Sequence, residues 1–151
     1  QNSTLKIIDL GGNSIGDEGV VALARVLHHN SSLVKIDLAR NSIGSNGTVS
    51  LSQALHRNST LQELDLSYNC IGDEGAIALA QSLHQNSTLK IIGLGNNSIG
   101  DSGAAALAEV LHHNSSLIKI DLALNSIRSN GAVSLSQAPC RVTIQMMMAK
   151  P

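Results

Sequence analysis

Recurring histidines are the residues of this sequence that could bind a metal ion. The chain has six histidines, and four of them follow one another at intervals of 28 residues: His28, His56, His84 and His112. A zinc ion needs its nitrogen ligands about 2.0–2.1 Å away, whereas equivalent positions on successive packed helices lie about 8–10 Å apart. The spacing therefore predicts solvated helix ends, and we expect no metal site and no cofactor.

Two glycine-containing segments, Gly11–Gly16 and Gly95–Gly100, match half of a phosphate-binding loop. That motif requires Lys directly after the second glycine, but the residues found there are Asp17 and Asp101. A carboxylate would repel a phosphate group, so we reject the match. Because each Ser, His and Asp falls in a repeated position, we expect no catalytic or cofactor-binding residue and no enzymatic activity.

The two cysteines, Cys70 and Cys140, are too few for a disulfide framework. Cys70 directly follows Asn69, which belongs to a column of asparagines repeated along the chain. A small residue at such a position predicts a buried, reduced thiol in the core.

Composition excludes several classes of binding protein. The 151 residues include 10 Lys and Arg and 11 Asp and Glu, for a formal net charge of −1. Phe and Trp are absent, and the chain has one Tyr. Binding of polyanions by bulk charge and stacking of bases on aromatic rings are therefore not expected. No apolar run reaches the about 20 residues of a membrane span, so we expect neither a nucleic-acid nor a membrane partner.

An internal repeat organises the chain. Leucines recur every 28 residues, at Leu5, Leu33, Leu61, Leu89 and Leu117. Asparagines recur with the same period, at Asn13, Asn41, Asn69, Asn97 and Asn125. We therefore expect five repeats over residues 1–138, starting near these leucines, and a non-repeat tail over 139–151, which begins with a helix-breaking Pro.

Each repeat predicts a strand, a turn and a helix. Apolar and polar residues alternate over 33–38, as in a strand with one exposed face. Val20, Leu23 and Leu27 then form an amphipathic helical stripe. We expect each helix to begin at a capping side chain and to end at an Asn in the left-handed conformation. The expected caps are Asp17, Ser45, Asp73 and Ser129, and the expected ends are Asn30, Asn58, Asn86 and Asn114.

Stacking such units predicts an α/β solenoid in the form of a horseshoe arc. Strands pair about 4.8 Å apart whereas helices pack about 8–10 Å apart, so a parallel sheet lines the concave face and helices cover the convex face. We expect the Asn column (13, 41, 69, 97 and 125) to be a structural ladder that bonds the backbone of adjacent turns. The glycine of each first helical turn predicts close packing against the neighbouring repeat.

The pattern Leu61-x-x-Leu64-x-Leu66-x-x-Asn69, followed by Ile-Gly-Asp-Glu-Gly-Ala over 71–76, resembles the ribonuclease-inhibitor-like class of leucine-rich repeats. The repeat sequence looks most like the repeats of NOD-like receptors. This resemblance implies a non-catalytic protein-interaction scaffold, from the sensor or autoinhibitory region of a longer cytoplasmic innate-immunity protein. Two alternatives remain: a GTPase regulator similar to Ran GTPase-activating protein, and a truncated product without retained activity.

The concave sheet face is the surface where we expect a protein partner to bind. Its columns vary between repeats, whereas the core columns do not. Arg and Tyr are enriched at interface hot spots, which favours the region around Arg40 and Tyr68. The candidate binding residues are Lys35, Asp37, Arg40, Glu63, Asp65 and Tyr68. The alternative is a solvated sheet face that binds nothing.

Overall fold

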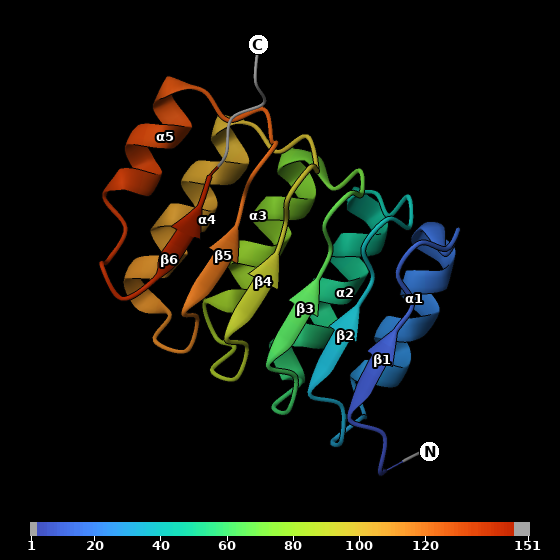
Figure 1. Cartoon of the computed structure of the whole chain (residues 1–151). Coiled ribbons are helices and arrows are strands. Elements are labelled where there is room, and N and C mark those ends of the chain that lie inside the picture. Colours follow the sequence, from blue (N-terminus) through green and yellow to red (C-terminus); the bar gives the residue numbers. More distant parts are fainter. Residues whose placement is uncertain (1–2, 147–151) are drawn as a thin grey trace.

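The computed structural model describes residues 3–146 as two layers, a sheet of short parallel strands and a row of helices behind it (Figure 1). Strands and helices alternate along the chain. The strands are β1 (Ile7–Asp9), β2 (Lys35–Asp37), β3 (Glu63–Asp65), β4 (Ile91–Gly93), β5 (Lys119–Asp121) and β6 (Thr143–Gln145). The helices are α1 (Gly16–Leu27), α2 (Ser45–Arg57), α3 (Gly72–Leu83), α4 (Asp101–His113) and α5 (Ser129–Ser136). The predicted α/β solenoid is confirmed.

Strand order in the sheet follows the sequence, β1 to β6, and every pair is parallel. From β1 to β5, each strand residue pairs with the equivalent residue of the next repeat, so that Ile36 of β2 pairs with Leu64 of β3. The last pair has a shorter spacing, because Lys119 faces Thr143. α5 has only 8 residues, compared with 12 or 13 in the other helices. The segment after residue 138 departs from the repeat sequence and nevertheless supplies a strand in register.

The core lies between the two layers and is aliphatic. The middle residue of each strand from β2 to β5 is buried, as Ile36 and Leu64 show. From the helical side, Val20 and Leu27 of α1 are buried, and Leu23 packs partly buried against them. Because branched aliphatic side chains fill these repeated positions, the stack needs no aromatic ring in its core.

Asn69 shows what the asparagines after the strands do. Its side-chain Nδ2 donates to the carbonyl of Leu66 in its own repeat at 2.9 Å and to that of Leu38 in the preceding repeat at 3.0 Å. Its Oδ1 accepts from the backbone N–H of Asn41 at 3.0 Å and of Ile43 at 2.9 Å. One amide therefore joins two turns of the solenoid. Asn41, Asn97 and Asn125 likewise bond two repeats, whereas Asn13 donates only to carbonyls of its own repeat.

A second row of asparagines lies at the opposite end of the helices. Asn86 donates to the carbonyl of Leu55 at 2.7 Å and of Asn58 at 3.1 Å, and its Oδ1 accepts from the N–H of Leu89 at 2.9 Å. The prediction of left-handed helix ends at these residues is wrong: Asn58 has φ −74 and ψ 130. Extended backbone turns the side chain inward, where it donates to the last carbonyl of the helix one repeat earlier and to the carbonyl of the asparagine that follows that helix. Asn58 and Asn114 make the same contacts.

Carboxylates bridge successive helices at their N-terminal ends. Asp73 of α3 accepts through Oδ1 from the N–H of Gly100 at 2.6 Å and of Gly103 at 3.0 Å, the N-cap and third residue of α4. The equivalent bonds join Gly44 to Asp17, and Arg128 and Gly131 to Asp101. Each Asp thus caps the helix of the next repeat.

The predicted capping of each helix by its own Asp or Ser is therefore wrong. Between residues 3 and 146, no helix has a side-chain cap from its own N-cap residue. α3 has no such cap from the repeat before it. There, Ser45 occupies the position that the capping Asp has in other repeats, and a serine has no carboxylate to accept from the next helix. α3 begins instead at Gly72 with a positive φ of 63, a conformation that glycine adopts without strain.

Candidate functional site

The candidate surface is built by β2, β3 and the turns that follow them. Side chains alternate along a strand, so the buried Ile36 places its neighbours Lys35 and Asp37 on the face away from the helices. The buried Leu64 does the same for Glu63 and Asp65. Because the register pairs Lys35 with Glu63 and Asp37 with Asp65, these four side chains lie in two rows across neighbouring strands. We call these residues, together with Arg40 and Tyr68, the sheet-face patch.

Lys35 and Glu63 form an ion pair on this face. The Lys35 Nζ lies 3.1 Å from the Glu63 Oε2, and both side chains are more than two-fifths exposed. The hydrogen bond that Lys35 donates to the Glu63 carboxylate, and then the negative charge of that carboxylate, raise the pKa of Lys35, while the loss of hydration around the ammonium group opposes the shift. The pair orients two long side chains on the exposed surface, although exposed pairs contribute little to stability.

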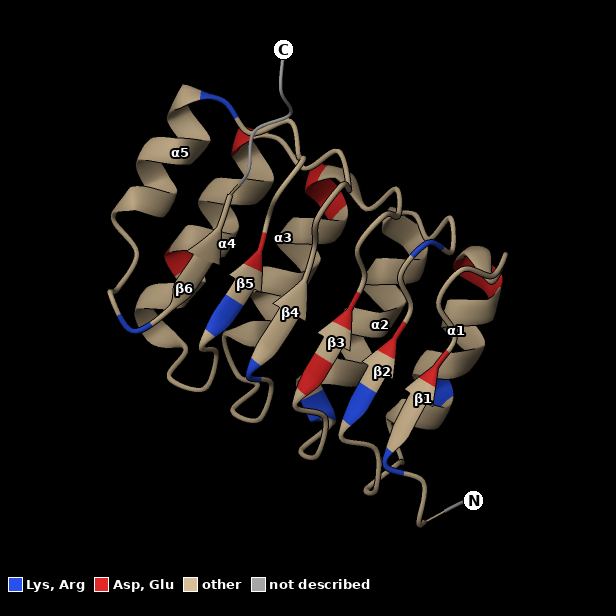
Figure 2. Ribbon diagram, in the orientation of Figure 1, with Lys and Arg blue, Asp and Glu red and all other residues tan. Residues whose placement is uncertain are grey.

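The aspartates of the patch have local structural partners. Asp37 Oδ1 accepts from the backbone N–H of Ala39, and Asp65 Oδ1 from that of Ser67, both at 2.9 Å. These bonds tighten the turn that follows each strand, as Asx turns do. Asp9 and Asp121 make the equivalent bonds in their own repeats. The aspartate column therefore supports the turns in addition to presenting negative charge (Figure 2).

Arg40 and Tyr68 lie on the two adjacent turns and contact each other. The Arg40 Cζ is 4.7 Å from the centroid of the Tyr68 ring, a cation–π geometry. Both residues are exposed, and both have left-handed backbone, with φ 59 and 57. Their backbone N–H groups bond carbonyls of the next repeat, those of Ser67 at 2.9 Å and Gly95 at 2.7 Å. These hydrogen bonds to the next repeat therefore fix the backbone from which the two side chains project.

The left-handed conformation is common to this whole column and is a feature that the sequence pattern did not predict. Gly12, Asn96 and Leu124 also have positive φ, between 53 and 71. Only Gly and, to a smaller degree, Asn adopt this conformation readily. Gly12 and Asn96 were the residues of this column from which the sequence could have predicted the left-handed conformation. Arg, Tyr and Leu disfavour this conformation, and the backbone N–H groups of Arg40 and Tyr68 are held in it by their bonds to the next repeat.

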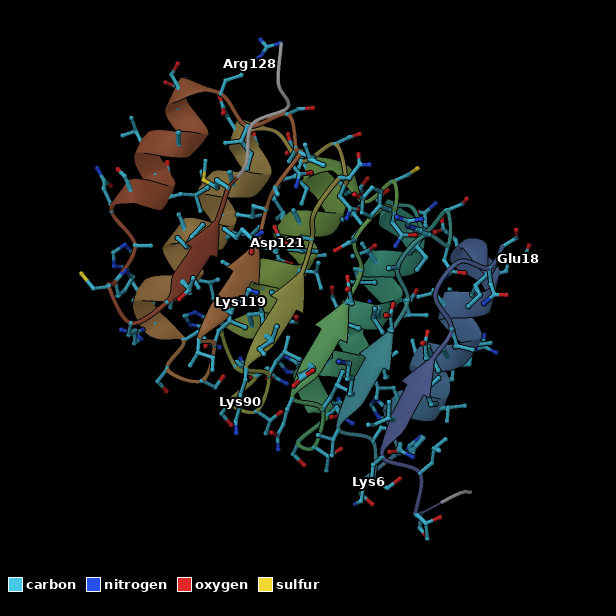
Figure 3. The ribbon with its side chains drawn as sticks, in the orientation of Figure 1. Lys6, Glu18, Lys90, Lys119, Asp121 and Arg128 are labelled. Atoms are coloured by element: carbon cyan, nitrogen blue, oxygen red, sulfur yellow. The ribbon has the colours of Figure 1, made fainter. Side chains whose placement is uncertain are left out.

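The sheet-face patch is bounded by changes of residue type on the adjacent strand. β4 has Ile91 opposite Glu63 and Gly93 opposite Asp65, so the charged rows stop there. Charge returns on β5 with Lys119 and Asp121 (Figure 3). The structure therefore brings all six predicted residues together on two neighbouring repeats, separated from the charged pair on β5.

Nothing in the described part of the chain provides the geometry of a metal centre. Within residues 3–146, no group of three or more His, Cys, Asp or Glu side chains could hold a metal ion. His84 and His113 are close, with ring centroids 5.4 Å apart in an edge-to-face arrangement. None of the helices within 3–146 combines the length and apolar character needed to cross a lipid bilayer.

The predicted burial of Cys70 is wrong. Its side chain is exposed and unpaired with another cysteine. The residue after each ladder asparagine points to solvent, and serines fill this position in the other four repeats. Those serines were the signal that could have predicted an exposed thiol.

Comparisons with known proteins identify the repeat and the fold. The family model described as Leucine Rich repeat matches five times, at residues 1–24, 29–52, 57–80, 85–108 and 113–136. No curated protein matches the sequence.

Two solved structures share the architecture. The structure of Leiomodin-1 Actin-Binding Site 2 (ABS2) is similar with a TM-score of 0.77 and 20% identity, covering 89% of this chain and 79% of that one. The tropomodulin C-terminal domain of Caenorhabditis elegans is similar with a TM-score of 0.74 and 17% identity, covering 90% and 83%. At these identities the likeness shows the fold.

Proposed function

The chain belongs to the leucine-rich-repeat family, and from this we propose that it is a non-catalytic scaffold that binds a protein partner. The proposed contact surface is the sheet-face patch. Its central feature is the stacked pair of Arg40 and Tyr68, which carries the proposal. The pair is exposed and its backbone is fixed by the turns.

Several properties of this pair suit a binding site. Tyr68 is the single aromatic residue of the chain and is 43% exposed. Burial of an aromatic ring and a guanidinium at an interface contributes strongly to binding. Because the backbone at both residues is already ordered, less conformational entropy is lost when a partner immobilises them. Neither side chain contributes to the core.

The charges around the pair favour a partner with complementary polarity. Asp37 and Asp65 are adjacent across the two strands and keep one row of the patch negative. Lys35 and Glu63 neutralise each other in the next row. A partner with basic side chains opposite the aspartates and an apolar or acidic group at the stacked pair would fit this arrangement.

We further propose that these repeats come from the sensor or autoinhibitory region of a NOD-like-receptor-type protein of the cytoplasm. The sequence Asn-x-Ile-Gly-Asp-Glu-Gly-Ala over 69–76 supports this assignment through its resemblance to that group. The similar leiomodin structure is that of an actin-binding site, which supports protein binding as a use of the same architecture.

Affinity capture with residues 1–151 as bait tests this function. The bait is compared with Tyr68→Ala and Arg40→Ala variants, and Lys119→Ala is a matched control on the same sheet outside the patch. We expect a specific protein to be lost from both patch variants and retained by the control. An unchanged set of bound proteins would count against the patch.

Two further measurements address the alternatives. Stimulated GTP hydrolysis by a Ran-type GTPase on addition of the purified chain would favour the regulator. Failure of the chain to unfold cooperatively would favour a product without retained activity.

A further inference from the structure

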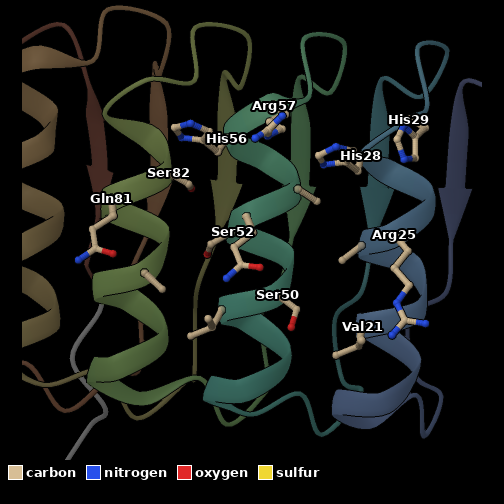
Figure 4. A pocket seen from close by; sticks show the side chains of 15 residues that line it. Val21, Arg25, His28, His29, Ser50, Ser52, His56, Arg57, Gln81 and Ser82 are labelled. Carbon is tan, nitrogen blue, oxygen red and sulfur yellow. The ribbon is translucent and has the colours of Figure 1, made fainter.

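A groove on the helical face is separate from the sheet-face patch. It lies across α1, α2 and α3 and has a volume of about 940 Å³ (Figure 4). Its floor consists of small buried residues, including Ala24, Ser52 and Ala54. Small side chains at these positions leave a channel between successive helices instead of a filled surface. The groove is elongated across three repeats, which suits a segment of chain.

The rim of this groove is basic. Arg25 of α1 and Arg57 of α2 line it, together with His28, His29 and His56. No Asp or Glu is among its lining residues. The acidic residues of α1 and α3 lie in the first turns of these helices, whereas the basic groups of the groove lie toward the last turns. The part of the helical face formed by α1, α2 and α3 is therefore divided by charge along the helix axis.

The two arginines have no internal counter-charge. Neither Arg25 nor Arg57 forms an ion pair with any residue between 3 and 146. Both guanidinium groups are thus exposed donors with unmet capacity for carboxylate oxygens.

We propose that this groove binds an acidic segment of a partner protein, with carboxylates on Arg25 and Arg57. Two guanidinium groups on adjacent helices match carboxylates spaced along one segment, since each guanidinium can bind a carboxylate through two parallel hydrogen bonds. The aliphatic and small floor accepts the methylene and methyl groups of such a segment. Nucleic acid fits less well, because no Phe, Tyr or Trp ring lines the groove for a base to stack on.

Fluorescence anisotropy with a labelled peptide of alternating Glu and Ala tests this proposal. The matched probe has Gln in place of each Glu, and a labelled single-stranded DNA oligonucleotide tests the competing class of partner. The protein is the full chain, as wild type and as the double variant Arg25→Gln/Arg57→Gln. Lys90→Gln/Lys119→Gln removes the same charge from outside the groove and is the control. Circular dichroism checks that all variants unfold at the same temperature.

We expect the Glu peptide to bind the wild type in low salt and to bind the arginine variant about tenfold more weakly. The lysine variant and the sheet-face variant Tyr68→Ala should bind as the wild type does. Equal weakening in the lysine and arginine variants would overturn the proposal, because net charge alone would then explain binding. Equal binding of the Gln peptide, or tighter binding of the DNA, would also overturn it.

Discussion

The Asp73 carboxylate accepts a hydrogen bond from the backbone N–H of Gly103, 30 residues further along the chain, at 3.0 Å. The two residues lie in the first turns of α3 and α4. A Cβ added to Gly103 would lie 2.8 Å from the same carboxylate oxygen. The glycine and the aspartate therefore depend on each other, and the N-terminus of one helix is completed by the preceding repeat.

Replacing Asp73 by Ala should lower the free energy of unfolding by about 1–2 kcal/mol, the usual effect of losing a helix cap. The N–H groups of Gly100 and Gly103 would lose their acceptor. Glu74→Ala is the matched control, because Glu74 is the adjacent exposed acid and makes no such bond. Urea unfolding measures both variants. Equal, small losses would show that the carboxylate does not act as a cap.

Asn69→Ala should cost more stability than Tyr68→Ala, although the two residues are adjacent. Asn69 is buried and its amide bonds backbone groups in two repeats. Leaving such groups without partners costs about 1–3 kcal/mol. Tyr68→Ala removes an exposed ring and should change stability by less than about 0.5 kcal/mol. Thermal unfolding distinguishes the two, and similar losses from both would remove the distinction between ladder and recognition residues.

The sequence predicted the architecture because its information is periodic. Alternation over 33–38 and the stripe of Val20, Leu23 and Leu27 each repeat with the same spacing, so strand, helix and sheet order followed directly. The pattern did not reveal whether a polar side chain forms its hydrogen bonds within its own repeat or with the neighbouring one. Asp73 and Asn58 both bond the neighbouring repeat, whereas local rules for helix ends assign them to their own helix.

The candidate site was predictable only as a set of exposed columns. Alternation along the strands places Lys35 and Glu63 on the same face, and the repeat brings them into register. The stacking of Arg40 on Tyr68 depends on positive φ at both residues. Neither residue type favours that conformation, so propensity predicted the opposite. Hydrogen bonds to the next repeat impose it, and these become visible only once the turns are stacked.

Glu63→Gln should lower the pKa of Lys35 toward its ordinary value, since the carboxylate is the main cause of the upward shift. A folded-state pKa above that of the unfolded chain means that the ion pair stabilises the fold at neutral pH. This contribution is lost as the pH rises through the folded-state pKa. NMR titration of the lysine side chains measures the shift. An unchanged pKa of Lys35 in this variant would contradict the assignment.

Arg141→Ala should destabilise the last repeat, because Arg141 replaces an asparagine of the second row. Its Nη2 donates to the carbonyl of Leu111 at 2.8 Å and of Asn114 at 2.7 Å, equivalent to the pair that Asn114 bonds one repeat earlier. We expect a loss of about 1–2 kcal/mol, as for a charge-assisted bond to backbone.

Hydrogen exchange locates that loss. Faster exchange at the N–H of Leu122, which bonds Gln145 of β6 at 2.8 Å, is expected in Arg141→Ala, with no change at β2 and β3. Arg128→Ala is the control, because the hydrogen bond of Arg128 to Asp101 comes from its backbone and survives the substitution. If both variants exchange like the wild type at β5, the guanidinium does not hold the sixth strand in place, and the register of Lys119 with Thr143 is sufficient for its pairing.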